Sequence, residues 1–193
     1  HRDLHLSIRR QRQMCIRDRY VIAVPHNIIG PRQRYDDPYR NVVSIMLNRM
    51  LQGKQPIIYG DGEQQRCFSY IDDCLYCLNA LAFQDNVVGE VINIGPDEEP
   101  ITINKLAEAC AIETGLNLDP IHHKDRPKEV KLAVCSSDKA RKLLGYNTAT
   151  NMRQSVKKTA EYIRTRGTKK FQYQLPLEII NENTPDTWKK KLI

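Results

Sequence analysis

The chain has 193 residues, of which 40% are hydrophobic and 27% charged, an ordinary composition for a globular protein. This composition excludes collagen-like, low-complexity and wholly disordered chains, and the length predicts one medium domain or a domain with a tail. No apolar run approaches the roughly 18 residues of a membrane-spanning helix, so we expect neither an integral membrane protein nor a membrane partner.

The formal net charge of +7 suggests a nucleic-acid partner at first, but its distribution argues against one. Residues 1–19 hold six arginines and two aspartates, a net charge of +4, which leaves +3 on the remaining chain. A small surplus among charges of both signs is typical of a solvated surface, whereas a nucleic-acid site gathers its basic residues in a stripe. We therefore predict no nucleic-acid partner.

Residues 1–19 lack the apolar periodicity of the rest of the chain, because their arginines fall on every face of a helix. Residues 14–19 also resemble one reading frame of a sequencing adapter. We predict that residues 1–19 are a foreign or disordered segment and leave them out of the fold prediction; a basic arm for nucleic acid is the alternative. The folded unit is expected at residues 20–167, followed by a C-terminal tail at residues 168–193. The tail is irregular but is expected to pack through Phe171, Tyr173, Leu175 and Trp188.

Apolar periodicity from Tyr20 onward predicts an alternation of strands and helices. Short apolar runs predict strands at residues 20–24, 56–59, 91–94 and 118–121, the first of them a buried strand. Apolar residues with helical spacing predict helices at residues 43–51, 71–82, 103–110, 139–144 and 152–163. Glycines are expected to end three of these helices, at Gly53, Gly115 and Gly145. Strands that alternate with helices predict an α/β fold.

The cysteines and histidines offer only weak signs of a redox or metal site. Six cysteines are scattered along a chain whose first residues do not resemble a secretory signal peptide. We therefore expect reduced thiols and a cytoplasmic location. Cys74 and Cys77 form a C-x-x-C pair inside an apolar helical pattern, which favours buried helix cysteines; a redox or zinc site is the alternative. His122 and His123 adjoin, and side chains that adjoin on a strand point to opposite faces, so we predict no metal site there.

Residues 56–73 are the most informative stretch. They predict a strand, a turn at residues 60–62, a loop in which Arg66 stands among amides and aromatic residues, and the start of a helix. Glycines let a ligand approach the backbone, and a guanidinium presents a planar fork that suits phosphate. The stretch therefore predicts a site for an anionic, hydrogen-bonding ligand.

Five motifs follow one another along the chain: Asn27-x-x-Gly-Pro31, Tyr59-Gly-Asp-Gly62, Gln64-x-Arg66-x-Phe68-x-Tyr70-x-Asp72-Asp73, Asn93-x-Gly95 and Leu143-Leu-Gly-Tyr146. In this order they resemble the C-terminal half of an extended short-chain dehydrogenase, in the branch of NAD-dependent nucleotide-sugar epimerases and dehydratases, with the greatest similarity to UDP-glucose 4-epimerase-like members. The resemblance implies a truncated α/β fold that contains the last Rossmann strand or strands and the smaller C-terminal substrate-binding domain.

The resemblance also implies which residues bind a UDP-sugar. Residues that match the family's diphosphate contacts are Asn27, Arg66 and Arg126. Residues that match the walls of its nucleotide pocket are Tyr59, Val42 and Val43, the last two beside the uracil. Positions beside the nicotinamide of NAD are matched by Pro25 and His26. Lys128-Glu129 replaces the family's Gly-Asp, so the family's ribose contact does not carry over to Glu129. A turn cap at Asn27 and a surface ion pair at Arg66 are the structural alternatives.

Two family motifs are not found in the sequence. There is no Gly-x-x-Gly-x-x-Gly loop for the NAD pyrophosphate, and none of the nine tyrosines has a lysine four residues on, as the family's Tyr-x-x-x-Lys pair requires. The resemblance thus implies an NAD-dependent parent, a homodimer that epimerises a UDP-sugar at C4 and has its dimer surface in the other half. This chain alone is expected to be inactive. UDP-glucuronate decarboxylase or sugar 4,6-dehydratase, and a catalytically inert nucleotide-binding module, are the alternatives.

Overall fold

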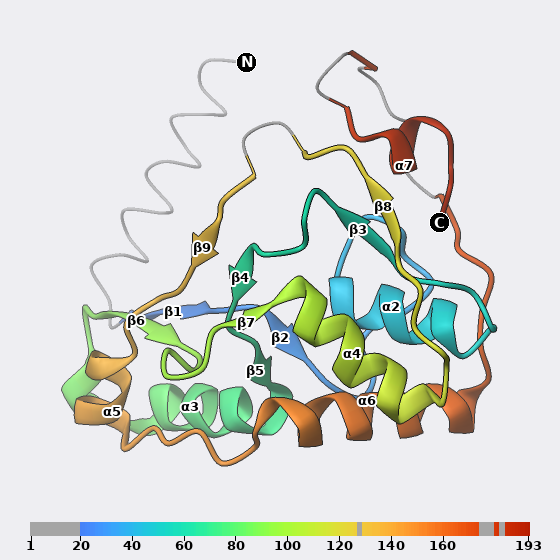
Figure 1. Cartoon of the computed structure of the whole chain (residues 1–193). Coiled ribbons are helices and arrows are strands. Elements are labelled where there is room, and N and C mark those ends of the chain that lie inside the picture. The colour runs from blue at the N-terminus through green and yellow to red at the C-terminus, as the bar shows by residue number, and fades with distance from the viewer. Residues whose placement is uncertain (1–19, 127–128, 174–179, 182–183) are drawn as a thin grey trace, which may run out of the picture.

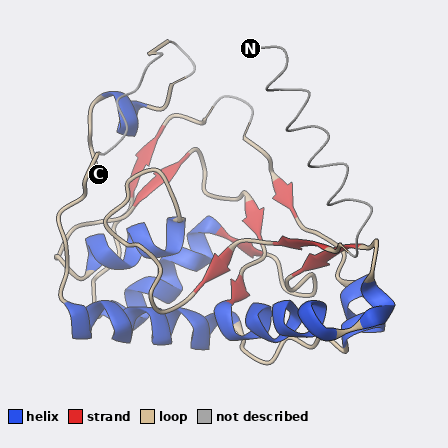
Figure 2. Ribbon diagram, turned by 180° about the vertical axis from the view of Figure 1, so that it is seen from behind, coloured by secondary structure: helices blue, strands red, loops and turns tan. Residues whose placement is uncertain are grey.

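The computed structural model describes residues 20–126, 129–173, 180–181 and 184–193. In these ranges the helices α2 to α6 gather on one side of the molecule, and most of the short strands and the short helix α7 lie on the other (Figures 1 and 2). The helices are α2 (Val42–Met50), α3 (Ile71–Phe83), α4 (Ile103–Thr114), α5 (Asp138–Leu144), α6 (Met152–Arg166) and α7 (Asp186–Lys189), with a 3-10 turn η1 at Asp85–Val87. None of the helices in the described ranges combines the length and apolar character needed to cross a bilayer.

The strands are short and mostly parallel. They are β1 (Ile22–Pro25), β2 (Ile28–Ile29), β3 (Ile57–Tyr59), β4 (Gln65–Arg66), β5 (Ser69–Tyr70), β6 (Val91–Ile94), β7 (Ile101–Thr102), β8 (Ile121–His123) and β9 (Leu132–Ala133). Three parallel pairs form, β1 with β6, β2 with β5 and β3 with β8. The fourth sheet has β4 in the middle, antiparallel to β7 and parallel to β9. Parallel neighbours need long crossover connections, and helices supply most of these, so the predicted α/β class is confirmed.

The helix ends follow from local chemistry. The side chain of Asn41 accepts a hydrogen bond from the backbone of Val43 at the start of α2, and Asn151 and Gln154 form a reciprocal capping box at the start of α6. At the other ends, Gly115 and Gly145 adopt the left-handed conformation, with φ of 74° and 66°, and end α4 and α5 as predicted.

Two hydrophobic cores hold these elements together. In the first core, α2, α4 and α6 pack against one another through the buried residues Val43, Leu47, Leu106, Val156 and Ile163. In the second core, α3 and α5 pack beneath the pair β1–β6 through Cys74, Cys77, Ile92, Ile94 and Leu144.

The C-x-x-C pair belongs to the second core. Cys74 and Cys77 are fully buried in α3, and burial raises the pKa of both thiols to about 11. A thiol that stays protonated at neutral pH is a poor nucleophile and a poor metal ligand. The interpretation as buried helix cysteines is confirmed.

The first predicted strand is not buried. β1 begins at Ile22, two residues later than predicted, and the side chains of Ile22 and Val24 are 48% and 42% exposed. The reason is its position, because β6 is the one strand that pairs with β1 in the described part of the chain, which leaves the other edge of β1 open.

The strand predicted at residues 118–121 is also displaced, since β8 begins only at Ile121. Pro120 has no N–H to donate to a strand ladder. Before it, the backbone is held by a side chain instead: the amide of Gln55 donates to the carbonyl of Asn117 and accepts from the N–H of Asp119.

The tail packs on the folded unit, as predicted, but it is not wholly irregular. The rings of Tyr173 and Trp188 both meet Tyr39 edge-on, at 6.0 Å and 5.4 Å between ring centroids. The short helix α7, which contains Trp188, was not predicted. Leu175 and the whole of residues 1–19 lie outside the described residues.

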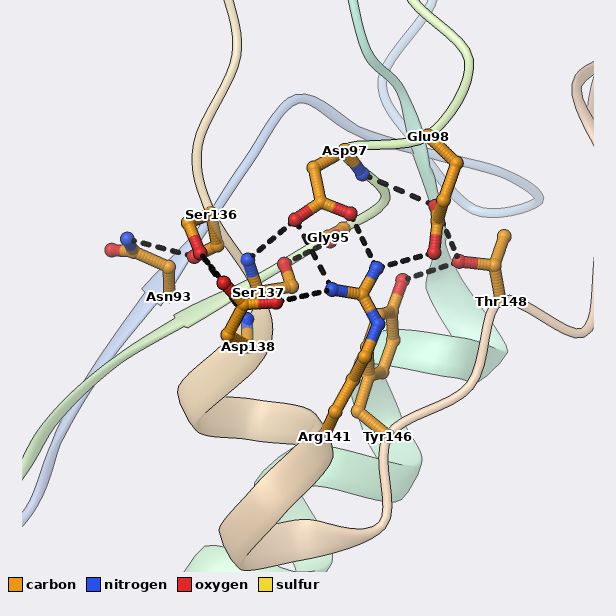
Figure 3. A network of polar contacts seen from close by, with 10 residues as sticks. All are labelled: Asn93, Gly95, Asp97, Glu98, Ser136, Ser137, Asp138, Arg141, Tyr146 and Thr148. Atoms are coloured by element: carbon orange, nitrogen blue, oxygen red, sulfur yellow. Dashed lines mark hydrogen bonds and ion pairs between the residues drawn. The ribbon is translucent and has the colours of Figure 1, made fainter.

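One polar network ties α5 to the loop after β6 (Figure 3). Arg141 of α5 donates to Asp97, Glu98 and Asp138, and the backbone N–H of Ser137 donates to Asp97 at 2.8 Å. The hydrogen bond from Arg141 holds the pKa of Asp97 below the ordinary value of an aspartate. The network fixes the start of α5 against the second core.

Candidate functional site

A cavity of about 390 Å³ opens between α2, the strands β3 and β4, and the C-terminal segment. Its apolar lining includes Val42, Ile45, Met46, Ile57, Phe68 and Ile103. Its polar lining includes Asn27, Tyr39, Arg40, Tyr59, Gln64, Arg66, Arg126 and Glu129. An apolar hollow with a few converging polar groups is typical of a small-molecule site.

Most of the predicted substrate-binding residues meet in this cavity, but one does not. Asn27, Val42, Tyr59, Arg66 and Arg126 all line it. Val43 is completely buried in the first core and does not line the cavity, so its place beside the uracil stays a prediction.

The position of Arg66 is set by its strand. β4 lies between two partners, and Arg66 pairs with Ile101 of β7 on one side and Ala133 of β9 on the other. Its guanidinium donates to the carboxylate of Glu129 at 2.5 Å and to the carbonyl of Gln65 at 2.7 Å. Only 17% of the Arg66 side chain is exposed, so this is a half-buried pair in a cavity wall rather than a surface ion pair.

Arg126 approaches the cavity from the segment after β8. Its guanidinium lies 4.3 Å from the centroid of the Tyr59 ring, a cation–π contact. The glycine turn after Tyr59 also makes room for neighbouring side chains, and the predicted approach of a ligand there stays a prediction. A side chain at Gly60 would collide with Asp125, and one at Gly62 would collide with Asn104. These glycines therefore make room for the chain's own side chains, one of which adjoins Arg126.

Asn27 has a structural task as well as a place in the cavity. Its φ of 41° lies in the left-handed region, which asparagine tolerates better than most residues. Its amide donates to the carbonyl of Cys67 at 2.9 Å and so joins the turn after β1 to the segment after β4.

Pro25 and His26, the predicted cofactor residues, do not line the cavity. Pro25 is exposed at the carboxyl end of β1. A ring nitrogen of His26 lies 3.2 Å from the carbonyl of Ala133 and 3.2 Å from the Asn27 amide. Their assignment to the nicotinamide stays a prediction.

Sequence reasoning missed several lining residues. Glu129 is the most important of them, because it is the ion-pair partner of Arg66 from 63 residues along the chain. Gln64 stood inside a quoted motif and was not assigned a role. Its amide donates to the carbonyl of Tyr59 at 3.2 Å and so closes the glycine turn.

The two adjacent histidines contact a backbone carbonyl and an aromatic ring. His122 bonds through a ring nitrogen to the carbonyl of Gly60 at 2.8 Å, and His123 tilts against the ring of Tyr59. In the described ranges, no three histidine, cysteine or acidic residues gather as metal ligands would.

The model of the NAD-dependent epimerase/dehydratase family matches residues 5–95. UDP-glucuronic acid decarboxylase 1 of Xenopus tropicalis is 30% identical over 171 residues, which is 88% of this chain and 38% of that protein. The chain is related to the NAD-dependent epimerase/dehydratase family. The match begins at residue 5, within the segment predicted to be foreign, and the origin of residues 1–19 stays a prediction.

Solved structures of this family share the fold. UDP-glucose 4-epimerase from Thermotoga maritima, solved with UDP-glucose, has a TM-score of 0.69 and 31% identity over 77% of this chain and 47% of that one. UDP-glucuronic acid 4-epimerase from Bacillus cereus, solved with UDP-glucuronic acid and NAD, has a TM-score of 0.69 and 31% identity over 76% of this chain and 46% of that one. The chain thus spans about half the length of the solved relatives that it matches.

Proposed function

We propose that the cavity binds the diphosphate and nucleoside of a UDP-sugar, and that the chain is the substrate-binding part of an NAD-dependent nucleotide-sugar 4-epimerase. The observation that carries this proposal is the convergence of Arg66 and Arg126 on one apolar cavity from separate parts of the chain. Two guanidiniums that line one cavity add positive charge to it, which favours an anionic ligand. The similarity to enzymes solved with UDP-sugars agrees with this ligand class.

The two arginines suit a diphosphate in different ways. Arg66 is half-buried and held on both strand edges, so it can grip phosphate oxygens with little loss of freedom. Arg126 rests on the Tyr59 ring at the side of the cavity, where it can close over the same phosphates. Val42 and Ile45 provide an apolar wall that suits a base. We assign the diphosphate to the arginines and the uracil to the α2 side.

The pair β1–β6 supports the assignment of this chain to the C-terminal half. Parallel strands occur almost only in larger sheets that are covered on both faces. Here Ile22, Val24 and Val91 are 48%, 42% and 49% exposed, on a pair that no other strand of the described residues joins at either edge. We propose that in the full-length parent this sheet continues as a Rossmann sheet, of which β1 and β6 are the last strands.

The described residues fit NAD only in part. In open α/β sheets, ligands bind beyond the carboxyl ends of the strands, and Pro25 ends β1 while His26 follows it. The glycine loop that would hold the pyrophosphate is not in the sequence, and neither is Tyr-x-x-x-Lys. NAD bound in the parent would accept and return the hydride. The residues of this chain bind and orient the sugar nucleotide, and we assign no proton or hydride transfer to them.

A decarboxylase of the same family is the second candidate. The observation that favours it is the similarity to the Xenopus tropicalis decarboxylase, which extends over 88% of this chain. The two candidates share the proposed diphosphate site and differ in the chemistry at the sugar.

Calorimetric titration of UDP and of uridine into the purified chain tests the proposed ligand. We expect UDP to bind at least about tenfold more tightly than uridine, because charge-assisted hydrogen bonds to phosphate exist only for UDP. Equal affinities would contradict a diphosphate site.

Incubation of the chain with NAD and UDP-glucose tests whether the chain binds its substrate without turning it over. We expect no UDP-galactose above background, and turnover that survives removal of host enzymes would contradict it.

A further inference from the structure

Residues 184–193 lie against the cavity although they come from the far end of the chain. Figure 1 places α7 beside the ends of β3 and β8, and Figure 2 shows the same neighbours from behind. The hydroxyl of Thr187 is hydrogen-bonded to that of Tyr59, and Ile193 lines the cavity itself. We call residues 184–193 the strap.

The far end of the strap is anchored to buried groups. The guanidinium of Arg49, a buried residue of α2, donates to the carbonyl of Leu192 at 3.2 Å. The hydroxyl of Tyr173 both donates to the carbonyl of Ile193 and accepts from its N–H, at 3.1 Å and 3.0 Å. These contacts hold the strap in one place over the cavity.

Trp188 is the strap residue that meets the proposed diphosphate site. Its ring lies 5.8 Å from the guanidinium of Arg126, which also rests on Tyr59 at 4.3 Å. Tyr39, another lining residue, meets Trp188 edge-on. Arg126 is thus flanked by two aromatic rings, one from β3 and one from the strap.

The indole N–H of Trp188 is buried beside this site without a hydrogen-bond partner. Among the described residues, it is the one buried side-chain polar atom without a hydrogen-bond partner. A buried donor in this state costs free energy, and such atoms are rare in folded proteins.

We propose that Trp188 is a positioning residue, which holds Arg126 against Tyr59 so that its guanidinium faces the diphosphate. The inference rests on the proposed function, since it assumes a nucleoside diphosphate in the cavity. An arginine side chain has many rotamers, and fixing it before the ligand arrives removes an entropic cost from binding. An aromatic ring can do this without neutralising the charge that the ligand needs, whereas a carboxylate partner would compete with phosphate.

The test compares three proteins by calorimetric titration with UDP and uridine: the wild-type chain, Trp188→Ala and Trp188→Phe. We expect Trp188→Ala to weaken UDP binding by about fivefold and to leave uridine binding unchanged, because only the phosphates meet Arg126. Trp188→Phe should recover most of the loss, since it keeps a ring. Lys190→Ala is the control within the strap, because Lys190 pairs with Asp186 on the surface, and it should bind UDP like the wild type.

Trp188 is the single tryptophan of the chain, so its fluorescence gives a second readout that needs no altered protein. UDP should change the fluorescence with the same midpoint as the calorimetric titration, and Arg126→Ala should abolish the change. Fluorescence that stays constant while UDP saturates the chain overturns the inference. Unchanged or tighter UDP binding by Trp188→Ala, or an equal loss for uridine, also overturns it and leaves the proposed function intact. A wild-type chain that binds no UDP overturns both.

Discussion

Arg66 and Arg141 are both paired with carboxylates, but their surroundings differ in charge. Arg141 meets three carboxylates, those of Asp97, Glu98 and Asp138 (Figure 3). Arg66 meets one, that of Glu129, in a cavity that Arg40 and Arg126 also line. The three carboxylates around Arg141 outnumber it, so this cluster has no net positive charge to attract an anionic ligand. The arginines named at the cavity outnumber Glu129, so the cavity wall has a net positive charge. The comparison separates an arginine that stabilises the fold from one that is available to a ligand.

Replacement of Arg141 should give the largest effect on stability and none on binding. Arg141→Ala removes the shared partner of three carboxylates, and the loss of hydrogen bonds to charged groups costs about 1.5–3 kcal/mol. Chemical denaturation should therefore show a free energy of unfolding lower by about that amount. UDP affinity, measured below the unfolding transition, should match the wild type. A weaker affinity for UDP would mean that the two arginines are not functionally separate.

Glu129→Gln should have a smaller effect, and its sign is informative. Glutamine retains a hydrogen bond to Arg66 but removes a negative charge that competes with phosphate. Coulomb repulsion of about 1 kcal/mol at an exposed 4 Å separation corresponds to roughly fivefold tighter UDP binding. The gain should fall as salt rises. Weaker UDP binding by this variant would show that Glu129 mainly orients Arg66 or contacts the ligand.

The smallest expected effect concerns how the free energy of unfolding depends on pH in acid solution. The pKa of Asp97 in the folded chain lies below its ordinary value, chiefly because Arg141 donates to it. A carboxyl with a lowered folded pKa stabilises the protein above its unfolded pKa, and the contribution is lost as pH falls through the folded value. As pH falls below the ordinary pKa of an aspartate, Asp97→Asn should lose less stability than the wild type. Parallel profiles in thermal unfolding at stepped pH would contradict the assignment.

Local chemistry made the helices predictable and left the smallest strands unpredictable. Gly115 and Gly145 end their helices because a left-handed residue is required there, and this preference is visible in the sequence. Strands β4 and β5 have two residues each, too few to show a period of two. These strands form because they pair with strands far away in the sequence, and no local sequence pattern predicts such pairing.

The same distinction applies to the site. Arg66 stood in a quoted motif, and both Arg66 and Arg126 were predicted through a resemblance. Glu129 and Trp188 were not assigned to the site, because their contacts join positions about 60 residues apart. Val42 and Val43 were both assigned through the resemblance, and the structure places Val42 at the cavity and Val43 in the first core.

The most direct test of the site is the UDP affinity of Arg66→Ala beside that of Lys139→Ala, measured by calorimetric titration of the same chain. Both variants remove one positive charge, but Lys139 pairs with Glu90 on the surface and does not line the cavity. We expect Arg66→Ala to bind UDP more weakly by about 1.5–3 kcal/mol, the usual range for hydrogen bonds to charged groups. Lys139→Ala should match the wild type, and Arg66→Lys should recover only part of the loss, because an ammonium lacks the planar fork. Equal UDP affinity in Arg66→Ala and the wild type would contradict the proposal that this cavity holds a diphosphate.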